Sequence, residues 1–266
     1  MILDTLFNLI SKLHHYRIAQ YSKNLKFNSL VDVGCHKGEF LTSFLKNKKI
    51  KKFYCFEPQK AIFRSLFNKF KNNKKIKFYN FALGNKLTKK KIYISNLTSM
   101  STLSKFNYKS KYLQFKNFLI SADKESKHSS FVIQKTIDSV FKNISLKKCF
   151  LKIDVEGYEY NVLNGANKKI KEVAFVLVEQ QFFDQYKNNF DQVKSFLIKN
   201  NFEIIKSFYF PTFHYKDILF KKKGSKNCPF WIFVWEKWGL NSHTYCANLN
   251  LFNFFTANFT AFSGET

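Results

Sequence analysis

The stretch from Phe150 to Glu159 combines a buried-looking apolar run with one lysine and three carboxylates. Lys152 and Asp154 are two residues apart, so on a β-strand they share one face. A lysine in a buried strand is rare unless it is paired. A carboxylate at the end of such a strand can take a proton from a hydroxyl group, although Glu156 and Glu159 also suit the first turn of a helix. We therefore predict Asp154, Glu156 and Lys152 as catalytic residues.

A second candidate for chemistry is the turn after Leu30–Val33, in which Asp32 precedes Gly34 and Gly38. The glycines leave backbone N–H groups open to a ligand. A dinucleotide fold expects G-x-G-x-x-G, but here an acid replaces the first glycine. A carboxylate repels a pyrophosphate and attracts a sulfonium that carries an ammonium group. The turn therefore favours S-adenosyl-L-methionine over NAD, the alternative being a strand-end turn without a ligand.

Two further positions suit a nucleoside. Glu57 ends the apolar run Phe53–Phe56, and a carboxylate there can accept both ribose hydroxyls. The alternative is an acid at a helix N-terminus. Ala82 closes the next apolar run, where an adenine ring would lie, but core packing explains an alanine equally well.

Strands and helices alternate along the chain, which predicts an α/β fold with a mostly parallel sheet covered by helices on both faces. The 266 residues suffice for one sizeable domain. The apolar patterns predict strands over 29–33, 52–57, 76–83, 91–95, 131–135, 149–154 and 173–179, a closing pair over 202–208 and 231–235, and helices over 38–46, 61–70, 136–140, 157–170 and 190–199.

The segment Ile153–Ala166 resembles the signature of the FkbM family of S-adenosyl-L-methionine-dependent methyltransferases. The resemblance runs from about Leu30 to Glu179. It includes, in the family's order, Val31–Gly34, Phe56–Pro58, Ala82–Gly84, Thr136–Asp138 and Val178–Glu179.

The resemblance implies a class I methyltransferase fold, a Rossmann-like three-layer sandwich with a seven-stranded sheet whose last strand is antiparallel. It also implies O-methylation of a hydroxyl on a sugar, glycan or secondary metabolite. By position it places Asp32, Gly34 and Gly38 at the methionine part, Glu57 at the ribose and Asp154 near the methyl group. A metal held by Asp154, Glu156 and Glu179 would suit Mg²⁺, but the spacing fixes no geometry, so we predict no metal site.

The composition bears on the partners. The formal net charge is +27, but lysines are spread along the chain and only Arg17 and Arg64 are arginines. Arginine is preferred for bidentate phosphate contacts, so the sequence disfavours nucleic acid. An RNA 2′-O-methyltransferase remains the alternative enzyme, although its Lys-Asp-Lys-Glu set is not matched here, since Glu179 ends the fifth strand. A non-catalytic binding protein with the same fold is the third reading.

The predicted organisation is an N-terminal helical segment over 1–27, a methyltransferase domain over 28–238 with an insertion at about 96–130, and an aromatic-rich tail over 239–266. The five cysteines form no CxxC pair, which favours a cytoplasmic protein. The N-terminal helix and the tail leave a peripheral membrane contact open. His36 in the glycine turn and His214 in a late loop are weaker ligand or base candidates. The acceptor and the oligomeric state are not predicted.

Overall fold

The computed structural model describes residues 2–94, 101–104, 128–182, 190–211 and 215–224. Most of the predicted insertion, the predicted strand over 231–235 and the tail over 239–266 therefore lie outside the described residues. The methyltransferase-like part falls in one compact unit, Met1–Asn227.

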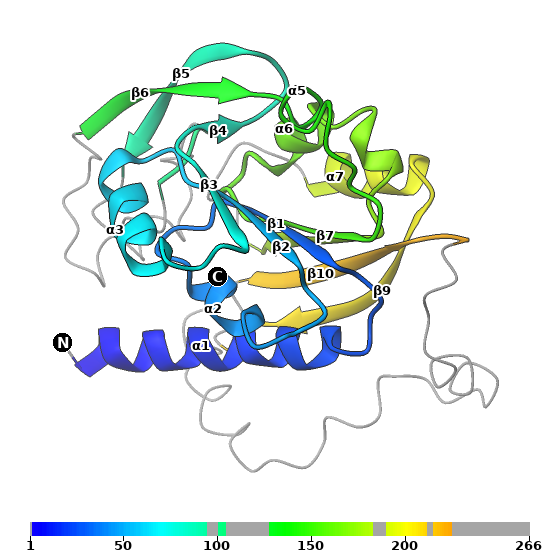
Figure 1. Ribbon diagram of the computed structural model, residues 1–266, viewed down its shortest axis with the longest axis horizontal. Coiled ribbons are helices and arrows are strands. Elements are labelled where there is room, and N and C mark those ends of the chain that lie inside the picture. Colours follow the sequence, from blue (N-terminus) through cyan, green and yellow to red (C-terminus); the bar gives the residue numbers. More distant parts are fainter. Residues whose placement is uncertain (1, 95–100, 105–127, 183–189, 212–214, 225–266) are drawn as a thin grey trace, which may run out of the picture. The chain divides into compact units, whose positions relative to one another are not determined.

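A seven-stranded sheet forms the centre of this unit, in the order β3-β2-β1-β7-β8-β10-β9 (Figure 1). The five strands β3, β2, β1, β7 and β8 run parallel, and β10 pairs antiparallel with both β8 and β9. The expected fold class, with an antiparallel last strand, is confirmed. The strands are β1 (Ser29–Val33), β2 (Lys52–Phe56), β3 (Ile76–Tyr79), β7 (Cys149–Ile153), β8 (Phe175–Gln181), β9 (Phe202–Tyr209) and β10 (Tyr215–Lys222).

A second sheet of three strands has the order β4-β6-β5. Helices cover both faces of the large sheet, because strand residues alternate between two apolar clusters. The first face packs on α1 (Ile2–Ser22), α2 (Glu39–Phe44) and α3 (Lys60–Phe70). The second packs on α5 (Ile137–Val140), α6 (Glu159–Asn164), the 3₁₀ turn Lys169–Lys171 and α7 (Phe190–Lys199), together with β4 (Ala82–Leu83), β5 (Thr88–Ile94) and β6 (His128–Lys135).

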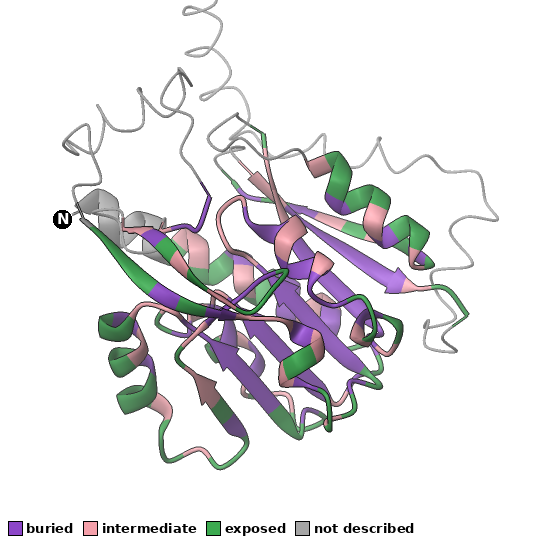
Figure 2. Cartoon of the chain, turned by 90° about the horizontal axis from the view of Figure 1, so that it is seen from above, coloured by how far each residue is buried: buried purple, intermediate pink, exposed green. Residues whose placement is uncertain are grey.

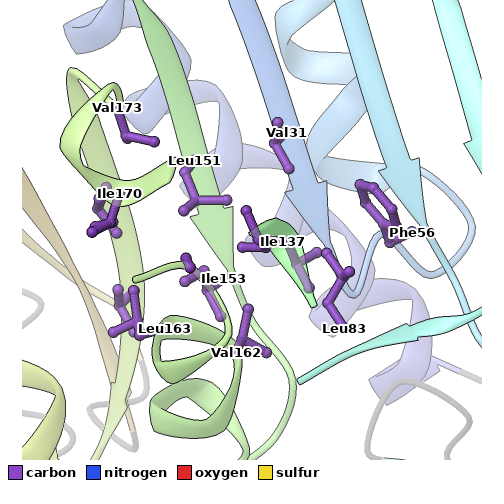
Figure 3. Packing of buried hydrophobic residues seen from close by; sticks show 14 of the residues in the cluster. Val31, Phe56, Leu83, Ile137, Leu151, Ile153, Val162, Leu163, Ile170 and Val173 are labelled. Atoms are coloured by element: carbon purple, nitrogen blue, oxygen red, sulfur yellow. The ribbon is translucent and has the colours of Figure 1, made fainter. Parts of the chain in front are cut away.

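The parallel strands β2, β1, β7 and β8 are mostly buried, and Figure 2 shows them as the purple centre of the sheet. On the second face, Val31 of β1 and Leu151 and Ile153 of β7 pack with α5 and α6 (Figure 3). Strands buried on both faces read as continuous apolar runs. This is why β1, β2, β7 and β8 lie close to their predicted ranges.

Two predicted elements were wrong. The single strand predicted over 76–83 is divided, because Asn80 turns the chain: its side-chain amide donates to the carbonyls of Glu57 and Pro58. The first half, β3, joins the large sheet, and the second half, β4, joins the small one. The helix predicted over 157–170 ends at Asn164, and the backbone of Gly165 caps it. A Cβ at Gly165 would lie 1.9 Å from the carbonyl oxygen of Gly84, so the close approach requires glycine.

The partner of β9 also differs from the prediction. It is β10, within a stretch predicted as a loop, rather than residues 231–235. The apolar centre of β10, Ile218–Phe220, is buried, but lysines and a tyrosine flank it. Because these polar residues flank a short apolar run, the sequence pattern did not predict a strand here.

The N-terminal helix α1 forms as predicted and packs its buried residues, among them Ile18 and Ala19, on the first face of the sheet. Within the described part of the chain, no helix has both the length and the apolarity needed to cross a membrane.

Candidate active site

The strand register places a row of charged residues on one face of the sheet, at the carboxyl ends of its parallel strands. Asp32 lies opposite Lys152 on the neighbouring strand. Asp154 follows two residues after Lys152, and Asp217 of β10 lies opposite Glu179 of β8. Because alternate strand residues share a face, all of these side chains point toward the α1–α2 side. In open α/β sheets, ligands bind at this edge.

Glu57 continues the row at the end of β2. Its carboxylate is 3% exposed and accepts hydrogen bonds from the backbone N–H groups of His36 (3.1 Å) and Gln59 (2.8 Å). Burial raises the pKa of Glu57 to about 7, against the lowering effect of these two bonds. A carboxylate has about four acceptor positions, so these two donors, which are the ones found among the described residues, leave capacity for two more. This spare capacity fits a pair of ribose hydroxyls.

Asp32 and Asp154 share the ammonium group of Lys152. The Lys152 Nζ lies 3.1 Å from Asp32 Oδ1 and 3.2 Å from Asp154 Oδ2, and it donates to the carbonyl of Gly34 at 3.0 Å. The Asp32 carboxylate is fully buried, and Lys152 is the cation that pairs with it. Burial raises the pKa of Asp32, and Lys152 opposes that shift.

These contacts indicate a structural role for Lys152. Burial disfavours its charge, but Asp154 and Asp32 outweigh that effect and raise the pKa of Lys152. Three oxygens therefore hold a cation that is only 5% exposed. The predicted catalytic role of Lys152 stays a prediction, and its contacts support a role in positioning Asp32, Asp154 and the glycine turn.

The backbone of the glycine turn adopts left-handed conformations, which its two glycines favour. Gly34, His36 and Gly38 all have positive φ, and a Cβ at Gly34 would lie 1.9 Å from the carbonyl oxygen of Asp154. The turn after β1 and the turn after β7 are therefore packed backbone to backbone. Glycine at 34 is required both by conformation and by space.

This packing gives a stability prediction. Gly34→Ala is expected to cost more than about 3 kcal/mol, from the left-handed conformation and the overlap together. Gly224 is a matched control, because it has a similar φ of +75° but no atom within 4 Å of the position that a Cβ would take. Gly224→Ala should cost only about 1–2 kcal/mol. Urea unfolding of both variants checks this, and equal losses would contradict the close approach.

The turn after β7 is also held tightly. Glu156 and Gly157 have positive φ values of 54° and 84°. The Glu159 carboxylate accepts from the backbone N–H groups of Val155 (3.2 Å) and Gly157 (2.9 Å), which makes Glu159 a structural residue of this turn. Burial raises the pKa of Glu159 to about 7.

Residues 101–104 also stabilise the turn after β7, through hydrogen bonds to its backbone carbonyls. The hydroxyl of Thr102 donates to the carbonyl of Glu156, and that of Ser104 donates to the carbonyl of Gly157 at 2.6 Å. Both side chains are buried. The part of the predicted insertion that the structure describes is thus attached to the candidate active site.

Three carboxylates converge beside this turn. Oxygens of Asp154, Glu156 and Glu179 all lie within 4.8 Å of one another. The side-chain amide of Gln181 donates to Glu156 (2.7 Å) and to Glu179 (3.0 Å). Burial raises the pKa of Glu179 well above its usual value, and Asp154, Glu156 and Asp217 add to the shift. We name these three residues the acid cluster; it offers a proton acceptor, and we assign no metal to it.

The contribution of α1 and β10 to the site could not be predicted from the sequence. His14 is fully buried, and its Nε2 lies 2.7 Å from Asp217 Oδ2. His15 packs against Phe40, and burial lowers the pKa of His15 to about 4. No short motif could reveal these residues, because 203 positions separate His14 from Asp217.

Of the other predicted residues, Ala82 is 4% exposed and its side chain belongs to the core of the second face. Any contact of Ala82 with an adenine therefore stays a prediction. His36 is fixed by its Nδ1 contact with Glu39 at 3.0 Å. His214 lies outside the described residues.

The sheet order, the antiparallel β10 and the carboxylates at the strand ends define a class I methyltransferase fold. The family model described as Methyltransferase FkbM domain matches residues 32–204, which is more than half of the chain. The protein therefore belongs to the FkbM methyltransferase family. Its methyl donor is S-adenosyl-L-methionine, and the spare acceptor capacity of Glu57 fits that nucleoside.

The solved structures that it matches are distant. An FkbM methyltransferase from Methylobacillus flagellatus is 16% identical, with a TM-score of 0.48, over 73% of this chain and 43% of that chain. A putative tRNA (m1A22) methyltransferase from Streptococcus pneumoniae, solved with S-adenosyl-L-methionine, is 10% identical, with a TM-score of 0.44, over 77% of this chain and 72% of that one.

Fibrillarin from Aeropyrum pernix, with natively bound S-adenosyl-L-methionine, is also 10% identical, with a TM-score of 0.44, over 78% of this chain and 76% of that chain. The present chain thus spans less than half of the matched FkbM structure. No curated protein matches it. None of these likenesses identifies an acceptor.

Proposed function

We propose that this protein transfers a methyl group from S-adenosyl-L-methionine to a hydroxyl oxygen of an uncharged, hydroxyl-rich acceptor, such as a sugar, a glycan or a secondary metabolite. The observation that supports this most is the acid cluster at the strand ends, beside the residues predicted to bind the donor. A hydroxyl must lose its proton as its oxygen is methylated, and a carboxylate within hydrogen-bond reach can accept that proton.

Each of the site residues would have a separate role in methyl transfer. Glu57 would accept the ribose hydroxyls, and the glycine turn would approach the methionine part. The donor supplies an activated methyl group when it is bound. Asp154, whose side chain is 32% exposed, would orient the acceptor hydroxyl and take its proton, with Glu156 as the second candidate. Lys152 holds Asp154 in place through their ion pair.

The charge of the site supports the acceptor class. Four carboxyl groups lie close together here, because the oxygens of the acid cluster are within 4.8 Å of one another and Asp217 lies directly opposite Glu179 in the β8–β10 ladder. An anionic acceptor would be repelled there, whereas hydroxyl groups donate hydrogen bonds to carboxylates. The local charge is thus opposite to the net charge of +27.

A mass-spectrometric assay tests the proposal. The protein is incubated with S-adenosyl-L-methionine that carries a trideuterated methyl group and with a panel of sugars and phenolic alcohols. Nucleotide-linked sugars are added as anionic comparisons, which should react least. The expected product carries the label on oxygen and resists mild base, which cleaves a methyl ester. Label on nitrogen or carbon would overturn O-methyl transfer.

The same assay includes RNA, because the lysine-rich composition keeps the RNA 2′-O-methyltransferase as an alternative. We expect no 2′-O-methyl label and only weak RNA binding that disappears with added salt. Labelled 2′-O-methyl nucleosides would favour RNA as the acceptor. Absence of any product together with absence of donor binding would favour a non-catalytic protein.

A further inference from the structure

The N-terminal helix contacts Asp217, a neighbour of the acid cluster, from outside the family's matched segment. That segment is residues 32–204, whereas His14 is on α1 and Asp217 is on β10. The two side chains meet at 2.7 Å, and the two residues are 0% and 7% exposed. The His14 ring also lies edge-on to the rings of Phe210 and Tyr215, at centroid distances of 5.2 and 5.7 Å.

Asp217 connects this pair to the candidate active site. It lies directly opposite Glu179 in the β8–β10 ladder, and directly opposed residues have Cβ atoms about 4.5–5.5 Å apart. Glu179 in turn belongs to the acid cluster. A continuous line of polar groups thus runs from α1 through β10 to the residues that would receive the acceptor's proton.

We propose that His14 and Asp217 are positioning residues of the methyltransferase site, which hold Glu179 and through it the acid cluster in the arrangement needed for proton transfer. The N-terminal helix is then a functional part of the site in this protein, in addition to covering the sheet. Neither residue touches the acceptor; both act through Glu179.

A purely structural anchor would not need polar groups here. Replacing a buried polar or ionic pair with apolar residues of similar volume is often neutral or stabilising. The polar pair instead places a carboxylate beside Glu179, whose surroundings already contain several charged groups. Asp154 and Glu156 face Glu179 from the turn after β7, and Gln181 on β8 donates a hydrogen bond to it. Asp217 and Tyr215 lie near Glu179 on β10. Lys152 is paired with Asp154, and His14 and His15 of α1 lie near Asp217.

The first experiment uses the double variant His14→Phe/Asp217→Leu in the full chain. It replaces the polar pair with an apolar one, so the melting temperature should stay near that of the wild type. We expect kcat to fall roughly tenfold to hundredfold, the size of effect that misplaced groups cause, while the Kd for S-adenosyl-L-methionine stays unchanged. Ser22→Ala, on the same buried face of α1, is the control and should leave both unchanged. A double variant with wild-type kcat would overturn the proposal.

The second experiment needs no acceptor, so it separates this inference from the proposed O-methyl transfer on which the kinetic experiment rests. Carbon-13 carboxyl NMR follows the titration of Glu179, assigned with Glu179→Gln, in the wild type and in Asp217→Asn. Removing the like charge should lower the titration midpoint of Glu179 by about one pH unit. An unchanged midpoint would overturn the link between Asp217 and the cluster, whether or not the wild type methylates any hydroxyl.

Discussion

Glu57→Gln is expected to weaken the binding of S-adenosyl-L-methionine roughly hundredfold, since hydrogen bonds to a charged group contribute about 1.5–3 kcal/mol each. The glutamine keeps the size of the side chain but removes the charge and one acceptor oxygen. Its amide would also face one of the two backbone N–H donors that now contact Glu57. Calorimetric titration at pH 8 measures the effect.

The control for this variant is Glu203→Gln, the same substitution at an exposed position on the edge strand β9. It should bind the donor as the wild type does. If Glu57→Gln also binds like the wild type, Glu57 does not hold the ribose, and the placement of the donor along this edge of the sheet is wrong.

Asp154→Asn is expected to abolish most of the turnover and to leave donor binding nearly intact. A general base contributes about 10²–10⁴-fold to the rate, and the amide cannot accept the proton. The variant should still fold, because Lys152 keeps its contacts with Asp32 and the carbonyl of Gly34. Single-turnover labelling with the preferred acceptor, beside calorimetry of the donor, separates the two effects.

Glu156→Gln discriminates between the two candidate bases. Glu156 already accepts a hydrogen bond from Gln181, so we expect a smaller loss, of about tenfold at most. Full activity in Asp154→Asn with a large loss in Glu156→Gln would transfer the role of base to Glu156. Full activity in both variants would exclude the two predicted bases.

The sequence predicted the parts of the site that local patterns encode. Asp32 and Lys152 lie in apolar strand runs, where a charge is conspicuous because it needs a partner, and the structure shows that each is the other's partner. Glu57 and Asp154 follow buried strands, so parallel pairing brings them to one edge. Fixed spacing within one strand and its turn was enough for these predictions.

The remaining features depend on contacts between distant segments. The strand β10 was not predicted, because its buried centre is only three apolar residues long. Without β10, nothing could place Asp217 beside Glu179 or bring His14 to the site. The bracing of the turn after β7 by Thr102 and Ser104 is likewise a contact across more than 50 residues. No periodicity within a single element can encode such a contact.

The pH dependence of donor binding tests the account most directly. The pKa of Glu57 is raised to about 7 in the donor-free protein, and only its ionised form offers all its acceptor positions to the ribose hydroxyls. Calorimetry should therefore show the affinity for S-adenosyl-L-methionine rising roughly tenfold from pH 6 to pH 8, with proton release on binding at pH 6, and Glu57→Gln should lose most of this rise and of the proton release. An affinity that does not change with pH, or a rise and a proton release of the same size in Glu57→Gln, would contradict the assignment of Glu57 as the ribose ligand.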